Sequence, residues 1–283
     1  MRILIIPFLL FFCSFGAFAY DIQYEKSDSI KVVSLLNSAR RQPEGTNIVI
    51  YFARQLKGVP YVAHTLEVNK DEQLIINLRQ LDCTTYVENV TALTLCVKQK
   101  AYTFEAFCAN LRKIRYRGGA IPHYTERLHY FTDWIEDNTR KGVCREVQSP
   151  NPPFSAVQNI NVYYMSTYPG KYKMLKGHPE YVKEIAATER ALNKKSYRYV
   201  PKLKVGNSAL MRKVVKDGDI IALTTTLKGL DIQHIGFAVW HEDGLHLLNA
   251  SSLRHKVVEE PMTLYRYLQR QRTMTGLRVV RLE

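Results

Sequence analysis

The sequence predicts an α+β protein, because helix patterns fill its first half and strand patterns fill its last part. Apolar residues recur at helical spacing up to about residue 138. From residue 219 onward, short runs rich in β-branched and aromatic residues alternate with turn signals such as Lys228-Gly229 and Glu242-Asp243-Gly244. Helices first and an antiparallel sheet last is the arrangement typical of the α+β class.

The individual elements follow from spacing and from residues that start or stop them. Amphipathic patterns predict helices over residues 27–41, 46–56, 82–100, 103–114 and 125–138. Lys57-Gly58-Val59-Pro60 is a stop signal, and a short strand is expected at 73–78. After a proline-rich break, a helix is expected at 179–192. The last part should hold strands at 219–224, 234–240, 245–250, 255–259 and 277–282, and a helix at 264–271.

The N-terminal residues have the composition of a secretory signal peptide. Arg2 gives a positive start, residues 3–15 are mainly apolar, and Ala17-Phe18-Ala19 is a small-x-small cleavage signature. The apolar run is too short for a membrane span, and the bulky Phe12 disfavours Cys13 as a lipoprotein acceptor. We therefore expect residues 1–19 to be removed and the chain to be exported, to the periplasm in a Gram-negative host, without stable membrane insertion.

The length and charge of the mature chain limit the domain number and the kinds of partner that we expect. Its length allows one large domain or two small ones, and no linker or repeat divides it. The net charge is +14, from 40 Lys and Arg against 26 Asp and Glu, which favours anionic surfaces in general. Nucleic acid is not the expected partner, because the charge is spread along the chain and no recognition motif accompanies it.

Cysteine usage leaves the disulfide state open. If Cys83, Cys96, Cys108 and Cys144 were all structural, two disulfides could form in an oxidising compartment, and at most one could form if Cys83 is a free nucleophile. The spacings match no zinc motif, so no metal site is predicted. Cys96 and Cys108 lie on apolar helical stretches, where burial is expected.

Cys83 stands where a reactive thiol would be expected. It begins the helix predicted at 82–100, with Asp82 beside it as the cap. The helix dipole and the unpaired amides of the first turn favour the thiolate form. A lone cysteine is more often a small buried hydrophobe, so a nucleophile also requires a base and a group that orients the base.

His234 and Asn249 are the polar residues expected to serve Cys83. His234 opens an apolar strand, and Gly236 allows another backbone to come close. Asn249 lies within an apolar run, where a buried amide needs partners that the neighbouring strand can supply. A hydrogen-bonded strand-end histidine is the alternative for His234. His246, on the face opposite Asn249, is expected to be exposed.

Several ordered motifs resemble the NlpC-type cysteine amidases, a papain-like group of cell-wall hydrolases. They are Leu81-Asp-Cys-Thr-Thr-Tyr-Val-Glu88, His234-Ile-Gly-Phe-Ala-Val239 and Leu247-Leu-Asn-Ala-Ser-Ser252. The closer resemblance is to the N-acetylmuramoyl-L-alanine amidase-like branch, whose pattern also includes Tyr116-Arg117-Gly118-Gly119 and Arg127-Leu-His129-Tyr130-Phe-Thr-Asp133-Trp134. The likeness extends over most of the chain from about residue 45.

The resemblance implies a single catalytic domain, residues 20–283, in which a helix carrying the nucleophile Cys83 packs on an antiparallel sheet or half-barrel. His234 would be the base and Asn249 the orienting group; relatives often carry His there, and Asn249 cannot stabilise the imidazolium by charge. The implied reaction hydrolyses the amide bond between N-acetylmuramic acid and L-alanine in peptidoglycan fragments through a thioester, without cofactor or metal. The alternatives are a D-glutamyl-diaminopimelate endopeptidase and a non-catalytic envelope-binding module.

The long connection between Cys83 and His234 is expected to build the binding cleft. Residues 100–201 are interpreted as an inserted substrate-recognition region, because the connection exceeds what a helix-to-sheet link needs. Charge-assisted bonds and stacking there suit an anionic sugar–peptide. The candidate contacts are Arg117, Tyr124, Arg127, His129 and Trp134, although the spacing of Tyr130 and Trp134 fits core packing equally well.

Overall fold

The computed structural model describes residues 22–119 and 123–283, so the expected signal peptide at 1–19 lies outside the described residues. The helices are α1 (Lys26–Arg40), α2 (Ile48–Gln55), α3 (Cys83–Lys98), α4 (Phe104–Arg115), α5 (Phe131–Arg140), α6 (Tyr164–Thr167), α7 (Pro179–Leu192), α8 (Ala209–Val214) and α9 (Leu264–Gln269). The strands are β1 (Ile22–Gln23), β2 (Leu74–Ile75), β3 (Cys144–Glu146), β4 (Ala156–Asn159), β5 (Ser196–Pro201), β6 (Ile220–Thr225), β7 (Ile232–Trp240), β8 (Leu245–Ser251), β9 (Lys256–Glu259) and β10 (Met274–Leu282).

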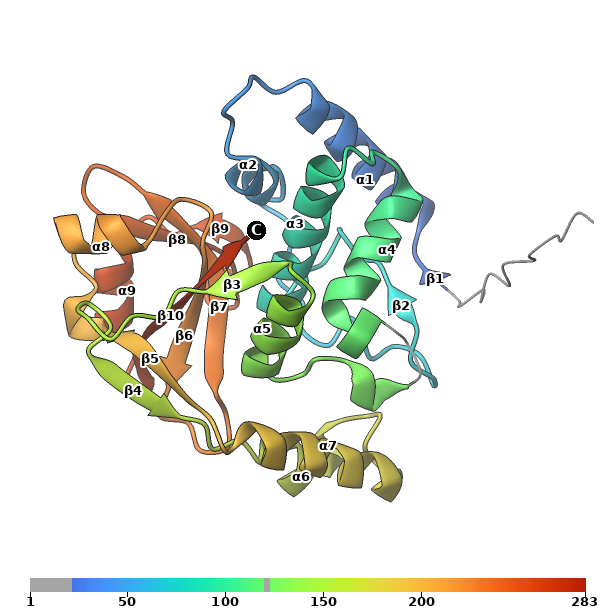
Figure 1. Cartoon of the computed structure of the whole chain (residues 1–283). Coiled ribbons are helices and arrows are strands. Elements are labelled where there is room, and N and C mark those ends of the chain that lie inside the picture. Colours follow the sequence, from blue (N-terminus) through green and yellow to red (C-terminus); the bar gives the residue numbers. More distant parts are fainter. Residues whose placement is uncertain (1–21, 120–122) are drawn as a thin grey trace, which may run out of the picture.

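One antiparallel sheet organises the molecule. Its strands follow the order β4-β5-β10-β6-β7-β8-β9, and β3 also pairs with β10. The consecutive strands β6 to β9 form a meander, whereas the C-terminal strand β10 lies between β5 and β6. Helices α1 to α5 gather on one side of the sheet, α8 and α9 lie on the other, and α6 and α7 lie at one end (Figure 1).

The alternation of apolar residues along β7 and β8 explains these two layers. Phe237 and Leu248 belong to the core that includes α3, whereas Ala238 and Leu247 belong to the core that includes α9. Successive side chains of a strand point to opposite faces, so a sheet covered on both faces is apolar at nearly every position. The predicted combination of helices with an antiparallel sheet is confirmed.

Several elements differ from the sequence-based expectation. The helix expected at 125–138 begins only at Phe131, because residues 124–126 form a separate 3₁₀ turn. The strands β3, β4 and β5 were not predicted, since β3 has three residues and β4 alternates between partly buried and exposed positions. They place parts of residues 100–201 in the main sheet, so this region is integrated with the fold around it.

The described cysteines are all free thiols. Cys96, Cys108 and Cys144 are buried, as expected for the first two from their apolar helical surroundings, and Cys83 is partly exposed. Over residues 22–119 and 123–283, no helix has both the length and the apolar character needed to cross a membrane.

Candidate active site

Helix α3 begins at Cys83 because the residue before it is a strong cap. The Asp82 carboxylate accepts a hydrogen bond from the Thr85 amide at 2.8 Å, and the Asp82 amide donates to the Thr85 hydroxyl at 2.9 Å. This reciprocal pair is a capping box, which fixes where the helix starts. Cys83 is therefore the first residue of the helix, and its amide is one of the donors that have no acceptor within the helix.

His234 and Asn249 form a buried hydrogen-bonded pair across β7 and β8. His234 Nε2 lies 2.8 Å from Asn249 Oδ1. Asn249 Nδ2 donates to the carbonyls of Leu247 and Val258, each at 3.3 Å. Because the amide nitrogen is used by two acceptors, Oδ1 must accept from the imidazole, so Nε2 carries a proton. In the neutral ring this leaves Nδ1 as the basic nitrogen.

Gly236 makes this pair possible. A Cβ added to Gly236 would lie 2.8 Å from both Asn249 Cβ and the Leu248 carbonyl oxygen. Any side chain at this position would therefore push β8 away from β7 beside the His234–Asn249 bond. The close approach of a neighbouring backbone, expected from the sequence, is confirmed.

A Gly236→Ala substitution is expected to lower the free energy of unfolding by about 1–3 kcal/mol through overpacking and to reduce any activity that depends on His234. Thermal or urea denaturation measures the first effect, and turnover measures the second. Gly206→Ala is a matched control, because a Cβ there would meet nothing within 4 Å. Equal stability of the two variants would contradict the packing argument.

Cys83 and His234 line the same cavity, which has a volume of about 220 Å³. The sulfur of Cys83 accepts hydrogen bonds from the backbone amide of Ile235, the residue after His234, and from Thr84. The nucleophile candidate thus lies against the strand that carries the base candidate. The remaining wall residues are Thr84, His129, Tyr130, Phe131, Met165, Tyr172, Leu230, Asp231, Ile232, Gln233 and Ile235.

The protonation states differ from the thiolate expected at a helix start. Burial, together with a smaller effect of the Asp82 carboxylate, raises the pKa of the Cys83 thiol to about 12. Burial lowers the pKa of His234 below its usual 6.5. The hydrogen bonds to the sulfur favour the thiolate but are outweighed by desolvation, which penalises the charged form. Near pH 7 the two side chains therefore rest as a neutral thiol and a neutral imidazole.

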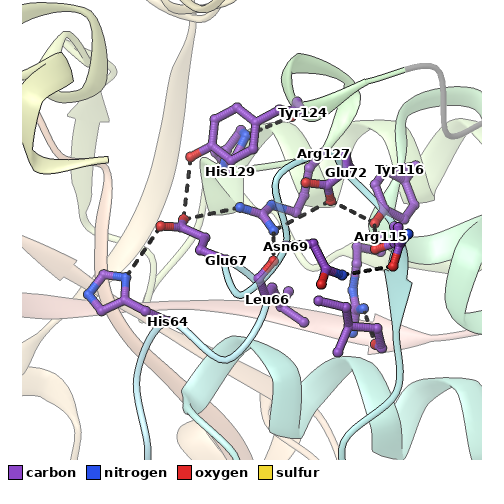
Figure 2. A network of polar contacts seen from close by, with 12 residues as sticks. His64, Leu66, Glu67, Asn69, Glu72, Arg115, Tyr116, Tyr124, Arg127 and His129 are labelled. Atoms are coloured by element: carbon purple, nitrogen blue, oxygen red, sulfur yellow. Dashed lines mark hydrogen bonds and ion pairs between the residues drawn. The ribbon is translucent and has the colours of Figure 1, made fainter. Parts of the chain in front are cut away.

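A second cavity of about 180 Å³ shares Thr84 and His129 with the first. Its other lining residues include Arg127 and Glu67. Figure 2 shows the Arg127 guanidinium between the carboxylates of Glu67 and Glu72, with N–O distances of 3.1 and 3.4 Å. The charge of Arg127 is thus balanced by two carboxylates. These ion pairs connect residues 64–72 to residues 116–129.

The five predicted substrate contacts divide into two groups. His129 lines both cavities and Arg127 lines the second. Tyr124 is fully buried beneath Arg127, 4.7 Å from its guanidinium, and Arg117 is held by both oxygens of Asp133 at 2.6 and 3.1 Å. Trp134 is fully buried in the core that contains α3. These last three side chains are absent from the described lining of either cavity.

Trp134 is therefore reassigned from substrate contact to core packing, which the helical spacing also allowed.

His246 is a second correction, since it was expected to be exposed and is 6% exposed. Its Nδ1 is bonded to the Glu260 carbonyl at 2.8 Å and its Nε2 lies 2.9 Å from the Asp243 carboxylate. The contacts that bury it come from Glu260, after β9, and from the turn before β8, which the strand pattern alone did not show.

The sequence-based reasoning missed the far wall of the Cys83 cavity. Met165 and Tyr172 come from the segment around α6, and Leu230 to Ile232 precede the catalytic candidate His234. The dense aromatic residues between 163 and 172 were the available signal for the first group. For Leu230 to Ile232, the available signal was their position in the sequence just before His234.

Comparison with known proteins gives consistent results. A structure of an N-acetylmuramoyl-L-alanine amidase from Bacteroides uniformis is 40% identical, with a TM-score of 0.79 over 85% of this chain and 100% of that one. A Bacteroides fragilis protein that carries a provisional xylanase name is 42% identical, with a TM-score of 0.76 over 81% and 99%. A Legionella pneumophila protein at 20% identity and a TM-score of 0.67 shares the fold over 90% and 94%.

No functionally curated protein shows significant similarity to the chain. The family described as AmiA-like, N-acetylmuramoyl-L-alanine amidase-like, matches residues 51–274. That match covers most of the chain and includes Cys83, His234 and Asn249. The chain therefore belongs to the N-acetylmuramoyl-L-alanine amidase-like family.

Proposed function

We propose that this protein is an exported cysteine amidase, with a papain-like core of the NlpC type, that cleaves the amide bond between N-acetylmuramic acid and L-alanine in peptidoglycan fragments. The observation that carries the proposal is that Cys83 lines one cavity with His234, whose imidazole is hydrogen-bonded to Asn249. A nucleophile, a base and a group that orients the base are the three parts that thiol-dependent acyl transfer requires.

The neutral resting pair determines the order of the steps. The Cys83 sulfur attacks the amide carbonyl while its proton moves to His234 Nδ1, and the Cys83 amide at the helix start donates to the developing oxyanion. The imidazolium then gives the proton to the leaving amine, and the carbon–nitrogen bond breaks to leave a thioester. Water, deprotonated by His234, hydrolyses the thioester, which releases the acid and restores the thiol.

The cavity wall suits an uncharged group around the scissile bond. Its described lining contains no Lys or Arg and one carboxylate, Asp231, whose Oδ2 accepts from the Thr132 amide at 2.7 Å. Burial and the nearby Arg127 hold the pKa of His129 well below 6.5, so its imidazole is neutral. Its Nε2 donates to the Tyr124 carbonyl at 3.0 Å, which leaves Nδ1 able to accept from a substrate amide.

The same wall argues against glycosidic-bond cleavage, which one structural neighbour's name suggests. Most glycosidases use two carboxylates on opposite sides of the bond. Asp231 is the single acidic side chain among the described residues that line the Cys83 cavity. The D-glutamyl-diaminopimelate bond needs the same thiol chemistry, so products decide between the two amide bonds.

Incubation of the purified protein with muropeptides is expected to release a free disaccharide and an intact stem peptide, identified by mass spectrometry. Cys83→Ala should release neither, because no thioester can form without the sulfur. Cys96→Ala is the matched control, since Cys96 is a buried thiol on the same helix outside the cavity lining.

Two other results would contradict the proposal. Products in which the disaccharide keeps L-alanine and D-glutamate would assign the D-glutamyl-diaminopimelate bond instead. Equal release by the wild type and Cys83→Ala would exclude the cysteine mechanism. Export is tested separately by N-terminal sequencing of the protein from cells, which should begin at Tyr20.

A further inference from the structure

We propose that Glu260 is a positioning residue that supplies the negative charge missing from the His234–Asn249 pair. This inference rests on the proposed role of His234 as the base. Asn249 Oδ1 accepts a hydrogen bond from His234 Nε2 but carries no charge. Proton transfer from Cys83 to His234 creates a positive imidazolium in a buried site. A nearby carboxylate would stabilise that cation.

The strand register places Glu260 on the same face of the sheet as this pair. A Cβ on Gly236 would meet side-chain atoms of both Asn249 and Leu247, so these residues share the face of β7 and β8 that carries His234. Asn249 pairs with Val258 of β9. Glu260 lies opposite Leu247 and follows Val258 by two residues. Because side chains two residues apart in an extended chain point to the same face, the Glu260 side chain lies on the face that carries Asn249.

The backbone around Glu260 is hydrogen-bonded to the part of β8 that precedes Asn249. The Glu260 amide donates to the Leu247 carbonyl at 2.9 Å, and the Glu260 carbonyl accepts from His246 Nδ1 at 2.8 Å. Two residues earlier, the Val258 carbonyl accepts from Asn249 Nδ2. The segment that carries the carboxylate is therefore the segment that also fixes the amide orientation of Asn249.

The Glu260 side chain is buried without full compensation. It is 3% exposed, and its Oε1 has no hydrogen-bond partner among the described residues. Its Oε2 lies 3.5 Å from Nε of Arg254, whose side chain is 43% exposed. A buried carboxylate oxygen with no partner is unfavourable for the fold, so its presence calls for another role. A purely structural position would be better filled by an apolar or fully bonded side chain.

The titratable groups near His234 come from several elements, and they include Asp231 and His129 in the lining of the same cavity. Cys83 and Asp82 lie at the start of α3, and Glu260 follows β9; both carboxylates raise the pKa of His234 against the effect of burial. Glu260 itself lines a separate cavity together with Arg254, Arg270 and Tyr267. Asp82 also raises the pKa of Cys83 and so opposes thiolate formation. Glu260 is placed to favour the imidazolium that forms when the thiol proton reaches His234.

The test is the titration of the His234 imidazole by NMR, assigned with a His234→Gln variant, together with the pH dependence of kcat/KM for muropeptides. Glu260→Gln keeps the shape of the side chain and removes its charge. It should lower the pKa of His234 by about one unit, which shifts the acidic limb of kcat/KM to lower pH, and reduce kcat/KM on the plateau about tenfold. Glu260→Asp should restore most of both values.

Two further variants make the test specific. Glu259→Gln is the matched control, because Glu259 is the adjacent carboxylate and pairs with Arg54 and His241 outside the site. Arg254→Gln should move the pKa of His234 upward, since it removes the partial counter-charge of Glu260.

An unchanged His234 titration in folded Glu260→Gln, or an equal shift in Glu259→Gln, would overturn the inference. If Glu260→Gln fails to fold, the Arg254→Gln variant provides the test. An unchanged or lowered pKa of His234 in Arg254→Gln would also overturn the inference. The titration does not need turnover. A wild-type protein that leaves muropeptides intact would therefore refute the proposed function while the role of Glu260 was still measured.

Discussion

Replacing His234 by glutamine is expected to reduce kcat/KM for muropeptides by about 10²–10⁴-fold while the protein stays folded. The thiol of Cys83 has its pKa raised to about 12 by burial, so almost no thiolate exists near pH 7 without a base. Glutamine can still bond to Asn249 but cannot take the proton. Steady-state kinetics with a disaccharide-peptide substrate measures the loss, and circular dichroism verifies the fold.

His178→Gln serves as the control for this prediction. His178 is about half exposed and pairs with Glu180 on the surface, so its replacement should leave kcat/KM unchanged. A His234→Gln variant within a factor of three of the wild type would mean that another group accepts the thiol proton. His129, which lines the same cavity, would then be the next residue to replace.

Arg115→Leu is expected to be the most destabilising of the substitutions considered, by about 3–5 kcal/mol. Arg115 and Glu88 are both buried, and Arg115 Nε lies 2.7 Å from Glu88 Oε2. Glu88 lies on α3, the helix that presents Cys83. Removal of the guanidinium leaves an unpaired carboxylate inside the core, where a charge without a partner is strongly unfavourable. Urea denaturation monitored by tryptophan fluorescence gives the change.

The double variant Arg115→Leu/Glu88→Leu tests the reason for this effect. Replacing both charges by apolar side chains removes the unpaired carboxylate, so most of the lost stability should return. Arg140→Leu is the surface comparison, since Arg140 is 60% exposed in its pair with Asp137, and it should change stability by less than about 1 kcal/mol. A double variant as unstable as Arg115→Leu alone would show that volume, not charge, controls this site.

The sequence predicted the main helices and the strands β6 to β10 because their periodic patterns are long and their ends carry turn or cap residues. Helix α7 was expected at 179–192 and runs over Pro179–Leu192. Strands β3 to β5 have no such pattern. They enter the sheet through β10, which is far along the chain: β3 and β5 pair with β10, and β4 pairs with β5. Pairing between distant segments leaves little trace in local composition.

The candidate site residues were selected for a related reason, since Cys83 marks a capped helix start and His234 and Asn249 each interrupt an apolar strand pattern. Their protonation could not be predicted, because desolvation depends on how completely the folded chain covers the sulfur. Arg117 and Arg127 show the same limit. Their carboxylate partners Asp133, Glu67 and Glu72 are set by tertiary contacts, so the sequence shows the two cations but not the carboxylates that pair with them.

The position of β10 has a consequence for how the protein is made. Strand β10, Met274–Leu282, joins the β6–β9 meander to β5 and β3, which come much earlier in the chain. The sheet therefore cannot close until residues 274–282 have been synthesised, long after β3 and β5 have left the ribosome. Until then β3 and β5 lack their pairing partner, so the edge strands on that side wait for a segment that is distant in the sequence.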